Sequence, residues 1–578
     1  MNTPETKRWS ILRRSLIGLG VLLTLIGLFY TEELWRGKRA WEKCKSGLVA
    51  EGVKFDWADY VSAPVPEEQN FFGVPEMQSW FTGRSESELA RKLSYPGFNS
   101  TSRMVVAEVT IGLPGIATTS GQTVLQWEDP GSRTEAARLL TNAIGPTASA
   151  PQSSQVLGLM VRKPEEIRPA RIFLQCQTAP AEEELQKFLP DSILVPAPEQ
   201  TNVLLKFERN GTGSYQVTLP VLAVAADYLA WSEQAEPEFT LIREALKRPY
   251  ARMNGNYTDP VAFPIPNFVT VRLLAQTLGA RAECHFLLGQ PEEALRDLTL
   301  INDFCRPVME ENKPMTLVAA MINVAVRGLY ASEIAEGMRL GAWREPQLTT
   351  LGKQLKQVNV LPPVRQACAA ERFFVWYDAA RLSTAEFLNL SDGFDPNRKT
   401  NSWKTFKSSV LGGLIPRGWI YQNIVVGVNV EANGIASLDP SGRLIFPDKA
   451  DEFSKELNAL LAHSSVYTII ARRMVPNYQR ALQTTAYNQT HVNQALIACA
   501  LERYHLAHGE YPETLEALEP QFIDEIPRDI IGGGSMHYRR TGGGKFILYS
   551  IGWNGRDDGG KRGRTTLPFT NGDWVWPD

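Results

Sequence analysis

The residues with the clearest chemical potential lie near the C-terminus, in a loop rich in side chains that carry oxygen. A hard cation such as calcium takes about six to eight oxygen ligands, so backbone carbonyls near Leu548 and Ile551 would have to complete the shell. The loop is not an EF-hand, because the third and twelfth positions counted from Asn554 are Arg556 and Thr565. It remains a candidate calcium site of another kind, with five side chains as possible ligands: Ser550, Asn554, Asp557, Asp558 and Asp573.

The same loop also fits a solvated turn without a metal. Basic side chains surround its acids and would weaken the attraction for a cation. Asp557 and Asp558 would then pair with arginines, at little gain where the pairs are exposed, or cap turns. The sequence leaves both interpretations open, and the basic side chains concerned are Arg556, Lys561, Arg562 and Arg564.

The rest of the chain carries no recognised catalytic or metal-binding signature. It has no HExxH, no GxSxG, no phosphate-binding GxxxxGK[ST] and no GxGxxG after a strand. His505 and His508 are three residues apart near a helix end, but no third ligand accompanies them. A hydrolase with dispersed carboxylates is one alternative. Two convergent carboxylates in a pocket, or a His beside a Ser or Cys, would indicate it.

Composition excludes some classes of protein. The 578 residues predict two to four domains, and 43% hydrophobic with 21% charged residues is ordinary globular material. A net charge of -3 argues against nucleic-acid binding, which calls for a basic face. The six cysteines are scattered singly without a CxxC pair, which favours buried free thiols over a zinc site or a disulfide framework.

The N-terminus predicts a membrane segment. Leu16 to Tyr30 is a run of 15 residues without a charge, and Lys7, Arg8, Arg13 and Arg14 precede it. The run is short for a full bilayer span and resembles a signal sequence, yet TEELWRG after it offers no small-x-small cleavage site. We therefore expect an uncleaved signal anchor over 1–31, with the N-terminus inside and the bulk of the chain extracytoplasmic.

Residues 32–220 predict a linker followed by an α+β domain. A helical pattern over 35–48 leads to a proline- and aromatic-rich stretch, 62–81, which we expect to be extended. Short runs of Val, Ile, Leu and aromatic residues then predict strands between 104 and 222, with a hairpin turn at 210–215. A helical insertion is expected over 132–142.

Residues 221–474 predict a mainly helical domain. The stretch 272–305 resembles one helical hairpin of the tetratricopeptide type, with a Gly-Gln-Pro break between two apolar stripes. It departs from that pattern at His285 and has no second copy 34 residues away, so an irregular helical domain is the simpler interpretation. The valine-rich 425–434 and the apolar 442–448 predict a local strand hairpin.

Residues 475–578 predict a small α+β module. A helix over 478–507 ends at His508-Gly509, since glycine is the usual left-handed cap. A short helix follows in ETLEALEP, then a loop containing IPRD. Two strands, MHYRR and KFILYS, flank a glycine turn before the oxygen-rich loop.

This ordered series resembles the soluble domain of the major (G-type) pseudopilins of type II secretion. The matching stretches are ALERYHLAHGEYPETLEAL, IPRD, HYRR and FILYSIGWNGRDDGG. The resemblance implies a long helix, a "P.D" loop and a small antiparallel sheet with KFILYS at its edge. It also implies a calcium loop for which Ser550, Asp557, Asp558 and Asp573 match the ligands best. The family's GFTLIE-like start is missing here, so the resemblance implies a pseudopilin-like module fused to a larger anchored protein.

Together these patterns predict a multidomain α+β protein with an N-terminal membrane anchor, an α+β domain, a mainly helical middle domain and a small C-terminal helix-plus-antiparallel-sheet module. The expected function is that of a non-enzymatic, membrane-anchored envelope protein that binds partner proteins. The alternatives are an envelope hydrolase and a scaffold of a secretion or pilus assembly.

Overall fold

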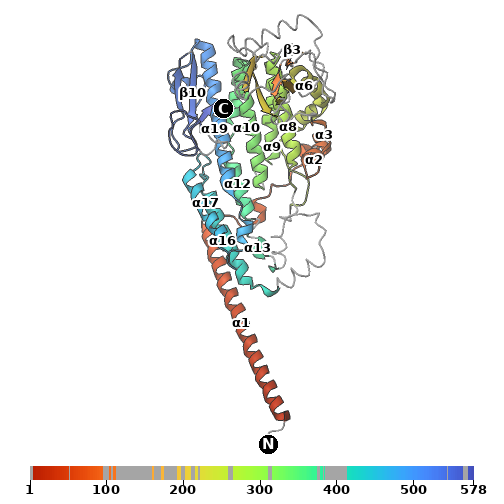
Figure 1. Cartoon of the computed structure of the whole chain (residues 1–578), viewed down its shortest axis with the longest axis vertical. Coiled ribbons are helices and arrows are strands. Elements are labelled where there is room, and N and C mark those ends of the chain that lie inside the picture. The colour runs from red at the N-terminus through yellow and green to blue at the C-terminus, as the bar shows by residue number, and fades with distance from the viewer. Residues whose placement is uncertain are drawn as a thin grey trace.

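The computed structural model describes residues 4–94, 222–257, 264–309, 316–384, 413–563 and 571–577, apart from 51, 374–375, 377, 382 and 543. Between 95 and 221 it describes seven short strands. The described chain is mostly helical, with an apolar helix at the N-terminus and a three-stranded antiparallel sheet near the C-terminus. Figure 1 shows an elongated molecule in which the N-terminal helix projects from a helical body.

The N-terminal helix α1 (Pro4–Ala50) contains both the apolar run and the helical pattern that follows it, without a break. Large apolar side chains from Leu16 to Phe29 are exposed to solvent. This half projects beyond the body, whereas the second half packs beside α16 (Arg417–Ile435) (Figure 1). The helix from Arg13 to Ala50 is long and apolar enough to cross a membrane, a property that signal sequences share.

The body is built mainly from helices that follow a proline-rich entry segment. In that segment, which the sequence predicts as extended, Phe71, Phe72 and Phe81 are buried, and it folds into two 3-10 turns and a short helix. The bounds of the helices up to α18 are α2 Pro75–Phe81, α3 Glu88–Lys92, α6 Ala225–Ser232, α7 Glu236–Leu246, α8 Phe268–Leu287, α9 Pro291–Val308, α10 Leu317–Arg339, α11 Glu345–Lys356, α12 Leu361–Arg372, α13 Asp378–Arg381, α17 Pro447–Ala462 and α18 Ala471–Met474.

The helices α8 and α9 form the hairpin expected over 272–305. Gly289 has a left-handed backbone (φ +71°), and Pro291 takes the first helical turn, where a missing N–H costs nothing. The hairpin encloses a buried ion pair in which Arg281 Nε lies 2.9 Å from Asp297 Oδ2. Arg243 of α7 lies 3.4 Å from the other oxygen of Asp297. Burial raises the pKa of Asp297, and the guanidinium of Arg281 opposes that rise.

Short strands occur within the range that the sequence predicts as strand-rich. The strand Leu159–Val161 is not among the predicted runs, and the predicted run 123–129 lies outside the described residues. The strands β5 (Ser192–Pro196), β6 (Asn202–Arg209), β7 (Tyr215–Thr218) and β4 (Arg171–Leu174) form one antiparallel sheet, and β6 pairs with β7 around the predicted turn. The remaining pairs are β1 (Arg103–Val105) with β8 (Leu222–Val224) and β2 (Val109–Ile111) with β3 (Leu159–Val161). The predicted helix over 132–142 lies outside the described residues.

The strand hairpin predicted for 425–434 and 442–448 is wrong. Residues 425–434 belong to the helix α16, which buries Ile420, Ile424, Val428 and Glu431 at spacings of three and four. The valine content is typical of strands, but packing against α1, α12 and α17 selects the helix. Residues 442–448 contribute two isolated bridges, Leu438 to Ile445 and Ile445 to Ile531, and the first turn of α17.

The C-terminal module begins with α19 (Tyr478–His508), which ends at Gly509 with φ +78° as the sequence predicts. The 3-10 turn η6 (Leu515–Leu518) precedes a sheet whose strand order is β11-β10-β9. The expectation that KFILYS is an edge strand is wrong, because β10 (Lys545–Ser550) lies between β9 (His537–Thr541) and β11 (Trp574–Trp576). The buried rings of Trp574 and Trp576 fix that third strand against α19.

The module shares one hydrophobic core with the helices of the body, a core that runs from Trp41 of α1 to Trp576. The helix α19 packs along α10 and α11. Its Gln489 side chain accepts from the Val360 N–H and donates to the Val358 carbonyl, so α19 is also tied to the start of α12. The helix α10 is also apolar enough to cross a membrane, but more than half of its most apolar stretch is buried, as in a core helix.

Candidate functional site

Asp573 organises the C-terminal loop from its base. The side chain is 2% exposed and immediately precedes β11. Its carboxylate accepts the backbone N–H of Asp558 at 3.1 Å and that of Gly560 at 2.6 Å. Carboxylates bonded to backbone amides make strong, charge-assisted hydrogen bonds. Asp573 therefore fastens the loop 554–560 to the edge of the sheet.

The two exposed acids of the loop hold its turns. Asp557 accepts the Gly559 N–H at 2.8 Å and the Tyr549 hydroxyl at 3.1 Å, and the bond from Gly559 is the main cause of its lowered pKa. Asp558 accepts the side-chain amide of Asn554 at 2.9 Å. The bond from the Gly559 N–H to Asp557 is a turn-capping contact of the kind that the second interpretation of the loop expects. Arg562, one of the basic neighbours, donates instead to the Val575 carbonyl.

Ser550 faces a different partner, Asp529. The Ser550 hydroxyl donates to Asp529 Oδ1 at 2.9 Å, and the Asp529 carboxylate also accepts the N–H groups of Ile531 and Ile551. Asp529 is buried, and burial raises its pKa against these three hydrogen bonds. The sequence prediction omitted Asp529 as a site residue, although the IPRD loop contains it.

The predicted ligands thus separate into two hydrogen-bonded groups. Ser550 is hydrogen-bonded to Asp529, whereas Asp557, Asp558 and Asp573 bond to amides and side chains of the loop itself. Among the described residues, no three or more His, Cys, Asp or Glu side chains lie together as a metal group. The described cysteines, Cys44, Cys284, Cys305, Cys368 and Cys499, are free thiols.

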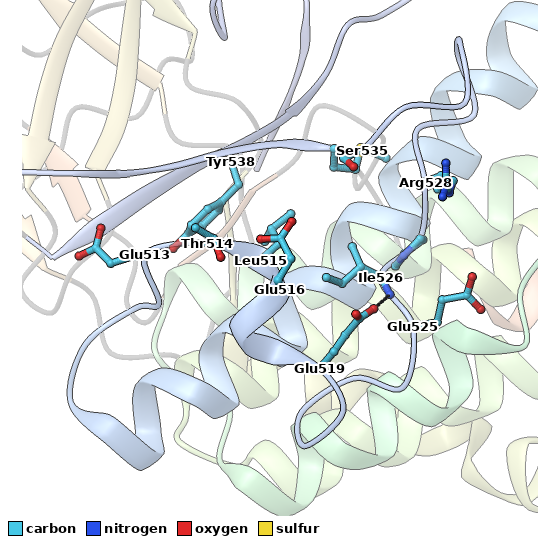
Figure 2. Close-up of a pocket in the computed structure, with 12 residues that line it drawn as sticks. Glu513, Thr514, Leu515, Glu516, Glu519, Glu525, Ile526, Arg528, Ser535 and Tyr538 are labelled. Atoms are coloured by element: carbon cyan, nitrogen blue, oxygen red, sulfur yellow. Dashed lines mark hydrogen bonds between the residues drawn. The ribbon is translucent and has the colours of Figure 1, made fainter.

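An open pocket of about 350 Å³ lies beside the sheet, between η6, the loop 525–528 and β9. Figure 2 shows Glu513 and Glu525 at opposite ends of this pocket, so these two carboxylates do not form an acid–base pair. Glu519 accepts the Ile526 N–H at 2.7 Å, and Glu513 pairs with Arg540. The pocket has an acidic lining, and two of its carboxylates, those of Glu513 and Glu519, serve the local structure.

Ser332 of α10 lies beside His491 of α19, with 3.3 Å between Oγ and Nε2. The imidazole is buried between the rings of Tyr487 and Trp576. Burial lowers the pKa of His491 to about 4. A general base works best with a pKa near the ambient pH. The pair therefore suits packing between two helices better than nucleophilic catalysis.

A second buried polar centre lies where α12, α16 and α19 meet. Glu431 of α16 is 1% exposed, and its carboxyl accepts the Trp376 indole N–H at 2.7 Å. The Tyr478 hydroxyl lies 3.4 Å from the other oxygen. Burial raises the pKa of Glu431 to about 8, so the side chain is largely neutral at pH 7. This centre joins the helix beside α1 to the first residue of α19.

The junction between α1 and the body is held by polar contacts at one level of the helix. The Tyr30 hydroxyl donates to the Leu414 carbonyl at 2.5 Å. Glu33 is buried, and it accepts from Arg36 at 2.7 Å and from the Tyr467 hydroxyl at 3.1 Å. Burying an ionised carboxylate requires such partners. The junction therefore begins directly where the apolar run ends.

Comparisons with known proteins identify no relative. No family model matches the chain, and no curated protein or solved structure matches it significantly.

Proposed function

We propose that this chain is a non-enzymatic, membrane-anchored envelope protein whose helical body binds partner proteins. The observation that supports the proposal best is α1, in which an exposed apolar half continues without a break into a half packed on the body. A helix of this kind carries the body on a rigid stem. The remaining bulk of the chain lies outside the membrane in this proposal.

Membrane extraction and protease protection test this function. The full chain is expected to stay in the membrane pellet of bacterial cells after a carbonate wash, and the double variant Leu22→Arg with Leu23→Arg is expected to be released. Protease added to spheroplasts should digest the body if it lies outside. Release of the wild-type chain by carbonate would contradict the anchor, and full protection of the body would contradict its proposed side.

A second candidate is a scaffold of a secretion or pilus assembly. It is favoured by the order of elements in 475–578, a long helix followed by a three-stranded antiparallel sheet, which agrees with the pseudopilin-like module that we propose for this end. We also propose, from the resemblance to pseudopilins, that the loop containing Asp557 and Asp558 binds calcium. Affinity capture from solubilised membranes tests the scaffold. Recovery of secretion or pilus subunits is expected, and capture of none would count against it.

A further inference from the structure

Exposed apolar side chains outside α1 are concentrated where α1 meets the body. In the described part of the chain they are Tyr250, Val269, Val318, Leu414, Leu461, Val466, Ile469 and Leu506. Four of these eight lie before α16 or around the α17–α18 connection: Leu414, Leu461, Val466 and Ile469. Single exposed apolar residues are ordinary, but a group at one place indicates an interaction surface.

The group lies level with the end of the apolar run. Leu414 is tied to Tyr30 through its carbonyl, and Tyr467 bonds to Glu33 and Arg36. The Trp419 ring bridges the two sides, with its centroid 6.3 Å from the ring of Phe29 and 6.3 Å from that of Tyr467. We call this surface the exit face and define it by Leu34, Trp35, Leu414, Trp419, Val466, Tyr467 and Ile469.

The apolar run of α1 is shorter than a bilayer is thick, so residues of the exit face would lie close to the membrane surface. Leu16 to Tyr30 rises about 23 Å in a helix, which is less than the ~30 Å hydrocarbon core of a bilayer. A short span is accommodated by a thinner bilayer or by flanking residues that enter the interface. Leu34, Trp35, Val466 and Ile469 are exposed apolar residues at the end of the run that meets the body.

The other side chains of the exit face suit lipid headgroups. Trp35 is 62% exposed, and Arg39 lies over its ring at 5.2 Å. Tryptophan and tyrosine are enriched at the level of the headgroups, and basic residues there attract anionic lipids. Exposed basic side chains border the face, with Glu32 as an exposed acid among them; they are Arg36, Lys38, Arg39 and Arg473.

We propose that the exit face is seated in the headgroup layer of a bilayer that contains anionic lipid. The body then lies against the membrane instead of standing clear of it on α1. This inference rests on the membrane anchoring proposed above, and it adds a second contact with the same bilayer. A second copy of the chain is the competing occupant.

Quenching of a fluorescent label tests the seating. The full chain, carrying Cys44→Ser and Cys176→Ser, is placed in nanodiscs of phosphatidylcholine and phosphatidylglycerol with doxyl-labelled lipid. Bimane is attached at Ile469→Cys, with Val466→Cys as a second position on the exit face. Leu22→Cys reports on the anchor, and Leu506→Cys is the exposed control near the far end of α19. The remaining described cysteines are buried.

Labels at 22, 466 and 469 are expected to be quenched by at least twofold, and the label at 506 is expected to be unaffected. If the label at 22 is quenched while the labels at 466 and 469 are unaffected, like the label at 506, the exit face does not lie in the headgroup layer. The proposed membrane anchor is then still supported. If 22 is not quenched, both proposals fail. Emission at 469 that changes with protein concentration, and not with doxyl lipid, would identify a second copy on the face and overturn the inference.

Discussion

Gly37 of α1 and Gly418 of α16 touch backbone to backbone. A Cβ atom on Gly37 would overlap the backbone of Gly418, and one on Gly418 would overlap the carbonyl of Glu33. Only glycine allows the two helices to approach so closely at this crossing. The helices run parallel here, since Tyr30 adjoins Leu414 and Cys44 adjoins Asn429. The packing of α1 on the body therefore depends on two residues without side chains.

Replacing Gly418 by alanine is expected to separate α1 from the body. The added methyl group meets backbone atoms that cannot rotate away, and overpacking of this kind costs about 1–3 kcal/mol. Urea unfolding and limited proteolysis of 30–50 measure the effect. Gly47→Ala is the matched control, because nothing lies within 4 Å of its added Cβ and alanine favours the helix. Equal stability of the two variants would contradict the close crossing.

The raised pKa of Glu431 predicts that the stability of the folded chain falls as the pH rises. Its folded pKa is about 8, raised from an ordinary value of 4.5, so the unfolded chain loses this proton earlier than the folded chain. The contribution of Glu431 to the free energy of unfolding is complete below pH 4.5. It is lost as the pH rises from 4.5 to 8, at up to about 1.4 kcal/mol per pH unit.

Glu431→Gln removes this ionisation and keeps an acceptor for the Trp376 N–H. The variant should gain stability relative to the wild type from pH 5 to 8, measured as the difference between their urea midpoints. The exposed Glu452→Gln should follow the wild-type curve at every pH. A constant difference between Glu431→Gln and the wild type would show that this carboxyl does not titrate in the window.

Asp297→Ala is expected to destabilise the chain by about 3–5 kcal/mol, because it leaves the buried Arg281 guanidinium without its closest carboxylate. Thermal unfolding measures the loss. The exposed pair Lys247–Glu244 supplies the control, and Glu244→Ala should cost under about 1 kcal/mol. Similar costs for the two variants would mean that the α8–α9 hairpin does not depend on its buried ion pair.

Asp573→Asn separates the two interpretations of the C-terminal loop. Both carboxylate oxygens accept backbone N–H groups, and an asparagine amide can replace only one of them. The variant should lose about 1–3 kcal/mol in the absence of any metal. If the loop is a turn without a metal, millimolar calcium leaves the melting temperatures of both proteins unchanged. A rise in the wild type that the variant lacks would identify a calcium site instead.

Local signals in the sequence predict the C-terminal elements well. The periodic pattern ending at His508-Gly509 locates α19, and Gly509 adopts the left-handed conformation that the cap requires. The third strand was not predicted, because Trp574 to Trp576 is too short to show alternation and is stabilised by β10 and α19. The central position of β10 follows from that contact between distant segments.

The valine-rich second half of α16, residues 425–434, shows where local propensity fails. Strand preference reflects burial on a pleated surface, and here the surroundings are helices. Gly427 allows Trp376 to pack closely against α16, a contact that no pattern within 425–434 reveals. For Asp529 and Ser550, 21 positions apart, the residue types are visible in the sequence, but their pairing depends on how the chain returns to the sheet.

The unbroken α1 also limits how the body explores its surroundings. A protein on a flexible linker samples a hemisphere of orientations and loses that freedom when it binds. A body packed on the helix that carries it has already given up most of this rotational entropy. With α1 as the membrane anchor proposed above, a partner in the same bilayer would meet the body mainly by lateral diffusion, always in one orientation, so that a weak contact would suffice to hold them together.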